Sequence, residues 1–186
     1  MKHKNVDEKI FIFLFMITAI GICAGVFFET FISGSGKQQL ASLLEAFLIS
    51  PKESVSFIKY ALKTALNTAI PLAIFFFVPA SVFLVPVIPV FMLLKSVSVG
   101  FASAMLFETM GNYAFKAAIF SLAIPNIIKL LTYSFIGTAS INISISNMRN
   151  NKNVLHANAR RYTKLYATTA IFLVLISIME AFIIIY

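Results

Sequence analysis

The sequence predicts an all-α, polytopic integral membrane protein of about five transmembrane helices with a proline-broken central hairpin. Three observations support this prediction. Of the 186 residues, 60% are hydrophobic and only 12% are charged, whereas an ordinary soluble domain is about 25% charged. The 31 residues between Lys63 and Lys95 carry no charge and hold four prolines. The basic residues also gather beside apolar runs, where they set the orientation of membrane proteins.

The first apolar run extends from Ile10 to Phe28, 19 uncharged residues after a basic start. It is longer than the apolar region of a secretory signal, which has roughly 7–15 residues. A bilayer core needs about 20 apolar helical residues, so we expect an uncleaved first span. Within it, Gly21 and Gly25 form a GxxxG pair on one helix face, where another helix could approach closely. These two glycines are the candidate helix contact.

The main polar stretch, residues 29–63, is expected to be an extracytoplasmic loop. Apolar residues at spacings of three and four between Gln38 and Ile49 predict an amphipathic helix that could lie at the membrane surface. Pro51 is expected to end that helix. Lysines in this loop partly oppose its placement outside, because the positive-inside rule favours lysine in the cytoplasm.

The uncharged run from residue 64 to 94 is too long for one soluble core helix and too broken by proline for one straight span. We expect one span at about residues 64–83, a turn near residues 85–89 and a second span to about residue 107. Another span is expected at about residues 115–139, interrupted at Pro125-Asn126. The last span is expected at residues 165–186, which makes residues 1–186 a single transmembrane domain.

Residues 140–164 are polar, asparagine-rich and basic, and they predict a cytoplasmic basic loop. The two basic clusters of the chain are Lys2, Lys4 and Lys9, then Arg149, Lys152, Arg160, Arg161 and Lys164. Both clusters flank apolar runs, so the net charge of +8 indicates membrane topology rather than nucleic-acid binding. A cytoplasmic N-terminus and five spans place the C-terminus outside.

Polar residues that interrupt apolar sequence are the candidate functional residues. Lys95, Lys129 and Glu180 are of this kind, and a charge at the bilayer centre costs roughly 2.5–3.5 kcal/mol on insertion scales. Asn126 lies three residues before Lys129 and shares its helix face, so these four residues form a candidate intramembrane polar patch. The patch could line an ion or substrate path, or its residues could reach the interface or pair to fix helix packing. If Lys129 is only structural, Lys129→Met should preserve function and could raise stability.

No sequence motif indicates an enzyme, since GxSxG, HExxH and paired-carboxylate patterns are missing. Neither His3 nor His156 has a partner at metal-ligand spacing. The single cysteine, Cys23, lies in the first apolar run and is expected to be a small buried hydrophobe. We therefore predict no catalytic residue, cofactor site or metal site.

Several short motifs occur in an order and spacing that resemble the stage II sporulation protein M family. Residues 86–101 read PVIPVFMLLKSVSVGF, with Lys95 nine residues after the first proline and Gly100-Phe101 five further on. The remaining matches are Gly25, Lys37-Gln38-Gln39-Leu40, Ile124-Pro125-Asn126, Gly137 and Glu180-Ala181-Phe182. The resemblance covers most of the chain, and Ser96 stands where the family usually has glycine.

The resemblance implies a non-enzymatic, multi-pass protein of a bacterial cell membrane, in contact with membrane lipid and not with nucleic acid. In its sporulation role the family anchors membrane-linked peptidoglycan hydrolases, which thin the septal cell wall for forespore engulfment. The loop at residues 29–63 and the faces of the spans would contact these partners. Similar proteins accompany circular bacteriocins in maturation, export or immunity, and that alternative implies an ABC-type transporter or an apolar peptide as partner.

Overall fold

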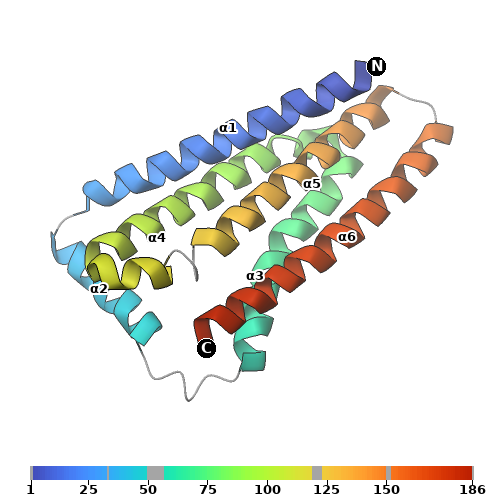
Figure 1. The fold of residues 1–186 in the computed structure, drawn as a ribbon. Coiled ribbons are helices and arrows are strands. Elements are labelled where there is room, and N and C mark those ends of the chain that lie inside the picture. Colours follow the sequence, from blue (N-terminus) through green and yellow to red (C-terminus); the bar gives the residue numbers. More distant parts are fainter. Residues whose placement is uncertain (1, 33, 50–56, 119–122, 150–151, 186) are drawn as a thin grey trace.

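The computed structural model describes the chain except at residues 1, 33, 50–56, 119–122, 150–151 and 186 (Figure 1). The described residues are helical apart from short turns and contain no strand. The helices are α1 (Lys2–Thr30), α2 (Gly34–Ile49), α3 (Phe57–Phe77), α4 (Val87–Ala118), α5 (Ile124–Arg149) and α6 (Lys152–Ile185). Two short 3-10 helices, η2 (Val78–Ala80) and η3 (Val82–Leu84), connect α3 to α4.

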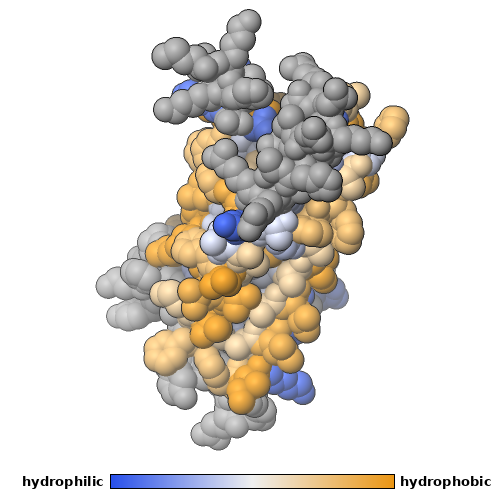
Figure 2. Space-filling view, turned by 90° about the vertical axis from the view of Figure 1, so that its right-hand side faces the viewer, coloured by the Kyte–Doolittle hydropathy of each residue, from blue (hydrophilic) through white to orange (hydrophobic). Residues whose placement is uncertain are grey.

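Five of the described helices are long and apolar enough to cross a membrane, which confirms the all-α, multi-pass prediction. The candidate spans are Glu8–Thr30, Phe57–Ala80, Val82–Glu108, Ile124–Met148 and Tyr162–Phe182. Each of them exposes large hydrophobic side chains, such as Phe27, Ile70, Phe83, Phe135 and Phe172. Hydrophobic residues cover most of the described surface in Figure 2, an arrangement that suits lipid and not water. Cys23 is also exposed on α1, so the prediction that it is buried was wrong.

The helices pack in two pairs around α5. Helix α1 runs along α4, α3 runs along α6, and α5 contacts all four (Figure 1). In the 18-residue apolar window of the α5 span 56% of the residues are buried, against 22–33% in the corresponding windows of the other spans. The ring of Tyr133 on α5 lies edge-on to Phe75 of α3 and Phe91 of α4, with centroid distances of 5.9 and 6.2 Å. Helix α5 is therefore the centre of the bundle.

Glycines allow α1 and α4 to approach each other at the level of the backbone. A Cβ atom at Gly25 would overlap the carbonyl oxygen of Val97 and lie 2.7 Å from the amide nitrogen of Phe101. A Cβ atom at Gly100 of α4 would in turn overlap the carbonyl of Ile22. The same contact continues at Gly21, where a Cβ atom would overlap the hydroxyl of Ser96. The GxxxG pair of α1 thus lies against α4, in the close packing that small residues permit between membrane helices.

The proline-rich run is broken where η2 and η3 lie, and Pro71 is accommodated inside α3. The predicted hairpin between the two spans is not what the packing shows. Helix α3 packs chiefly on α6 and α4 on α1, while α5 contacts both of these spans and the two 3-10 helices between them. The chain changes direction at the prolines, but the two spans that they connect pack on α5, α6 and α1 instead of chiefly on each other.

Two other expectations need correction. Pro125 lies in the first turn of α5 instead of interrupting a span; the first N–H groups of a helix have no intrahelical acceptor, so proline costs little there. Residues 140–164, expected as a loop, are helical except at residues 150–151, which lie outside the described residues. The buried hydroxyl of Ser140 lies 2.8 Å from the carbonyl oxygen of Ile136. Small polar side chains can bond back to their own helix in this way, so polar sequence did not require a loop.

The N-terminus lies at the same end of the bundle as the connection between α5 and α6 (Figure 1). The C-terminus, the start of α3 and the shorter helix α2 lie toward the other end. The backbone of both basic clusters is therefore at one end, the arrangement that five crossings require. Apart from Lys9 and Lys164, the side chains of these clusters lie outside the described residues, as do Pro51 and the side chains of residues 43–49 in α2.

Candidate functional site

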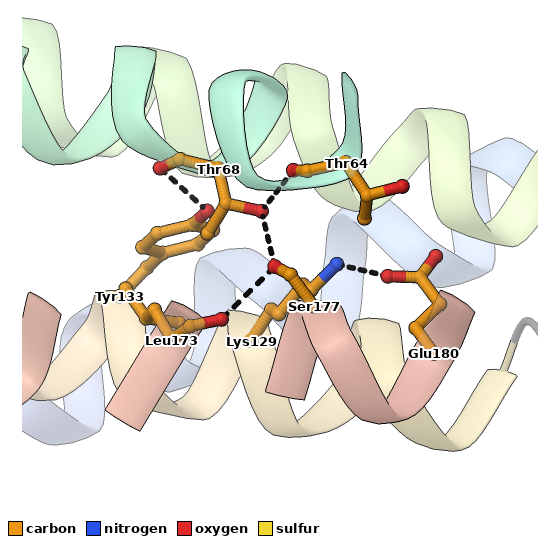
Figure 3. A network of polar contacts seen from close by, with 7 residues as sticks. All are labelled: Thr64, Thr68, Lys129, Tyr133, Leu173, Ser177 and Glu180. Carbon is orange, nitrogen blue, oxygen red and sulfur yellow. Dashed lines mark hydrogen bonds and ion pairs between the residues drawn. The ribbon is translucent and has the colours of Figure 1, made fainter. Parts of the chain in front are cut away.

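A buried ion pair joins the two central polar residues of the bundle. Lys129 of α5 and Glu180 of α6 are 6% and 8% exposed, and the ammonium of Lys129 donates to the carboxylate of Glu180 (Figure 3). Both residues belong to predicted membrane spans, where an unpaired charge is costly. Pairing lowers that cost and ties α5 to α6.

This ion pair forms one wall of a polar cavity of about 260 Å³. The cavity is lined by Tyr60, Lys63, Thr64, Asn67, Thr68, Lys95, Asn126, Lys129, Tyr133 and Glu180. All four residues of the predicted polar patch, Lys95, Asn126, Lys129 and Glu180, are among them. The structure brings these residues together from three helices, although up to 85 positions separate Lys95 from Glu180.

Helix α3 supplies the other half of the lining, which sequence reasoning missed. Its residues Tyr60, Lys63, Thr64, Asn67 and Thr68 follow the spacing i, i+3, i+4, i+7 and i+8. That spacing puts them on one helix face. Tyrosine and threonine have nearly neutral hydropathy, so hydropathy alone gives little signal at Tyr60, Thr64 and Thr68. The periodicity of polar residues in an apolar span was the signal that could have identified them.

Hydrogen bonds join α3, α5 and α6 beside the cavity (Figure 3). The hydroxyls of Thr68 on α3 and Ser177 on α6 lie 3.1 Å apart. The hydroxyl of Tyr133 on α5 donates to the backbone carbonyl of Thr68 over 3.3 Å. Just beyond, Pro71 has no amide hydrogen, so the carbonyl of Asn67 lacks its usual helical donor. Three helices thus meet at a polar level inside an otherwise apolar bundle.

The lining carries a surplus of positive charge. Among the described residues that line it, three lysines stand against one glutamate, a difference of +2. Glu180 pairs with Lys129. Lys95 of α4 is half-buried in the same cavity, and Lys63 is exposed. The cavity therefore combines hydrogen-bond donors with cations that the single carboxylate does not neutralise.

A second charged cluster holds α2 against the bundle. The ammonium of Lys37 on α2 lies 2.7 Å from the carboxylate of Glu29 at the end of α1 and 2.9 Å from that of Glu108 on α4. Hydrogen bonds with Glu29, and then with Glu108, raise the pKa of Lys37. Lys37 thus fixes the start of α2 against the ends of two spans.

The described part of the chain contains no group of three or more histidine, cysteine, aspartate or glutamate residues that could hold a metal ion. No protein-family model, curated protein or solved structure matches the chain.

Proposed function

We propose that this chain is a non-enzymatic scaffold of a bacterial cell membrane, similar to the stage II sporulation protein M family, that anchors cell-wall hydrolases for septal peptidoglycan thinning and forespore engulfment. The observation that supports this proposal is where the residues of the resemblance lie. Gly25 and Gly100 pack at the contact between α1 and α4, and Lys95, Asn126 and Glu180 line one cavity. Motifs that are far apart in the sequence therefore meet at two places, the contact between α1 and α4 and the cavity.

The scaffold role needs a surface held in a fixed position outside the membrane. Under the predicted orientation, α2 and the end of α4 lie on the extracytoplasmic side. The pairing of Lys37 with Glu29 and Glu108 holds α2 to these span ends. We propose that this end of the bundle, with α2, contacts the hydrolases.

The test is affinity purification of the tagged full chain from gently solubilised native membranes, with the partners identified by mass spectrometry. We expect peptidoglycan hydrolases to be recovered. Lys37→Met should lower their recovery at an unchanged level of the chain. Lys164→Met, an exposed change toward the other end of the bundle, is the matched control and should leave recovery unchanged. Recovery without any hydrolase would contradict the scaffold role.

A second function, in circular bacteriocin maturation, export or immunity, is favoured by a different feature. An apolar groove of about 530 Å³ runs between α1, α5 and α6. It is lined by Phe11, Leu131, Thr132, Phe135, Thr168, Thr169 and Phe172. Such a groove suits an apolar peptide that enters from the lipid. Recovery of an ABC-type transporter or a small apolar peptide in the same purification would favour this function.

A further inference from the structure

The cavity between α3, α4, α5 and α6 has the chemistry of an anion site. Its surplus of +2 comes from lysines on three different helices, Lys63, Lys95 and Lys129, with Glu180 as the opposing charge. Because Lys129 pairs with Glu180, the surplus belongs to Lys63 and Lys95. Lys63 is exposed to solvent, whereas the ammonium of Lys95 is half-buried, and a half-buried charge is costly unless an anion or water compensates it.

The exposure of the lining residues decreases from the mouth of the cavity to its floor. Lys63 and Asn67 are exposed, Lys95 is half-buried, and Lys129 and Tyr133 are buried. A ligand that enters at the mouth therefore meets an ammonium first and lies between cations from α3 and α4. Beside these lysines, the exposed side-chain amide of Asn67 can donate a further hydrogen bond.

The mouth of the cavity lies near the membrane interface, and the cavity reaches inward to Lys95, which is 13 residues from either end of its span. Tyr60 and Lys63 lie three and six residues into the span that starts at Phe57, about 5 and 9 Å along a helix that rises 1.5 Å per residue. Asn126 lies two residues into the α5 span. Tyrosine and lysine are typical of the membrane–water interface.

We propose that this cavity binds a phosphate group, carried either by a phospholipid headgroup or by a small soluble phosphate. A phosphate carries one to two negative charges, which matches the surplus of the lining. Lysine binds phosphate as a point charge. The cavity volume of about 260 Å³ lies below the roughly 300–1,000 Å³ of sites for drug-sized ligands. It therefore suits a headgroup or a small ion and not a peptide.

The test measures the thermal unfolding midpoint of the purified full chain in neutral detergent. One arm adds inorganic phosphate, with chloride at the same ionic strength as reference. The other adds phosphatidylglycerol, with phosphatidylcholine as reference. A ligand that binds only the folded state raises the midpoint in proportion to the logarithm of its concentration. This measurement does not depend on the scaffold role, so either proposal can fail alone.

Two variants locate the site. Lys95→Met removes the half-buried cation, and Lys63→Met removes the exposed one. Because Lys63 is exposed, we expect Lys63→Met to fold even if Lys95→Met does not. We expect each to weaken the apparent affinity about tenfold or more, the loss of one charge-assisted hydrogen bond. Lys59→Met is the matched control, because Lys59 is exposed on the same helix and is not one of the described lining residues.

The outcomes identify the source of the phosphate or overturn the proposal. A soluble phosphate is supported as ligand if inorganic phosphate raises the thermal unfolding midpoint, if Lys63→Met reduces that rise and if Lys59→Met keeps it. A rise with phosphatidylglycerol alone, with the same pattern of variants, supports a lipid headgroup. No rise in either arm, or an equal rise in Lys63→Met and Lys59→Met, overturns the proposal.

Discussion

The hydroxyl of Tyr162 donates a hydrogen bond of 2.8 Å to the backbone carbonyl of Phe75. This carbonyl has no helical donor, because the residue four positions later is Pro79, which lacks an amide hydrogen. The hydroxyl of Ser140 lies 3.1 Å from the same oxygen. On the next turn, the amide of Asn147 donates to the carbonyl of Pro79 over 3.1 Å. Side chains of α5 and α6 therefore satisfy the backbone carbonyls that are left free where α3 ends, as a membrane requires.

Tyr162→Phe removes one of these donors, and we expect it to lower the stability of the bundle by about 1 kcal/mol, the scale of hydrogen bonds between membrane helices. The thermal unfolding midpoint of the purified chain should fall accordingly. Tyr166→Phe makes the same change one turn along α6 and is the control. An equal loss in both variants would show that the hydroxyl at position 162 has no special role.

Lys129→Met alone should destabilise the chain, because it leaves the buried carboxylate of Glu180 without its partner. We expect a loss of about 2 kcal/mol, below the 3–5 kcal/mol of fully enclosed pairs, because the cavity is partly open. The double variant Lys129→Met/Glu180→Leu should recover most of that loss. Chemical or thermal unfolding of all four proteins gives the coupling energy. Additive effects of the two changes would contradict a direct pair.

This expectation reverses what the sequence suggested for Lys129→Met. An apolar residue at position 129 looks favourable when the helix is considered alone, because lipid penalises charge. The sequence marked Lys129 and Glu180 as unusual, but the distance between them depends on how α5 and α6 pack. The spans follow from hydropathy, whereas which spans become neighbours does not, since apolar faces fit many partners.

Other parts of the structure show the same limit. The GxxxG spacing identified the face of α1 that carries Gly21 and Gly25, but nothing local named α4 as its neighbour. The polar face of α3 was missed because threonine and tyrosine hardly change the hydropathy of a span, so that only the helical spacing connects them with Lys63 and Asn67. Pro125 was taken as an interruption because the same residue can end a helix or begin one, and only the path of the chain decides between them.

Gly100→Ala should separate α1 from α4, because the added Cβ atom meets the backbone carbonyl of Ile22 and no rotamer change can relieve that contact. We expect a net loss of about 1–3 kcal/mol, even though alanine favours the helix by about 1 kcal/mol over glycine. The thermal midpoint and the yield of folded chain in membranes are the measurements.

Gly34→Ala is the matched control for this change, since nothing described lies within 4 Å of a Cβ atom at Gly34. Its midpoint should stay the same or rise slightly. If Gly100→Ala is as stable as Gly34→Ala, the close approach of the two backbones does not contribute to stability.

Lys37 should make the stability of the chain depend on pH in the alkaline range. Its carboxylate partners, Glu29 first and then Glu108, raise its pKa above the ordinary value of 10.5. The folded state then holds this proton more tightly than the unfolded state does, so the stabilisation is complete below the ordinary pKa and is lost as pH rises through the raised one. The midpoint difference between the natural chain and Lys37→Met should be constant from about pH 7 to 9 and shrink above about pH 10.5. A difference that disappears at neutral pH, or one that Lys59→Met reproduces, would contradict the role of this cluster.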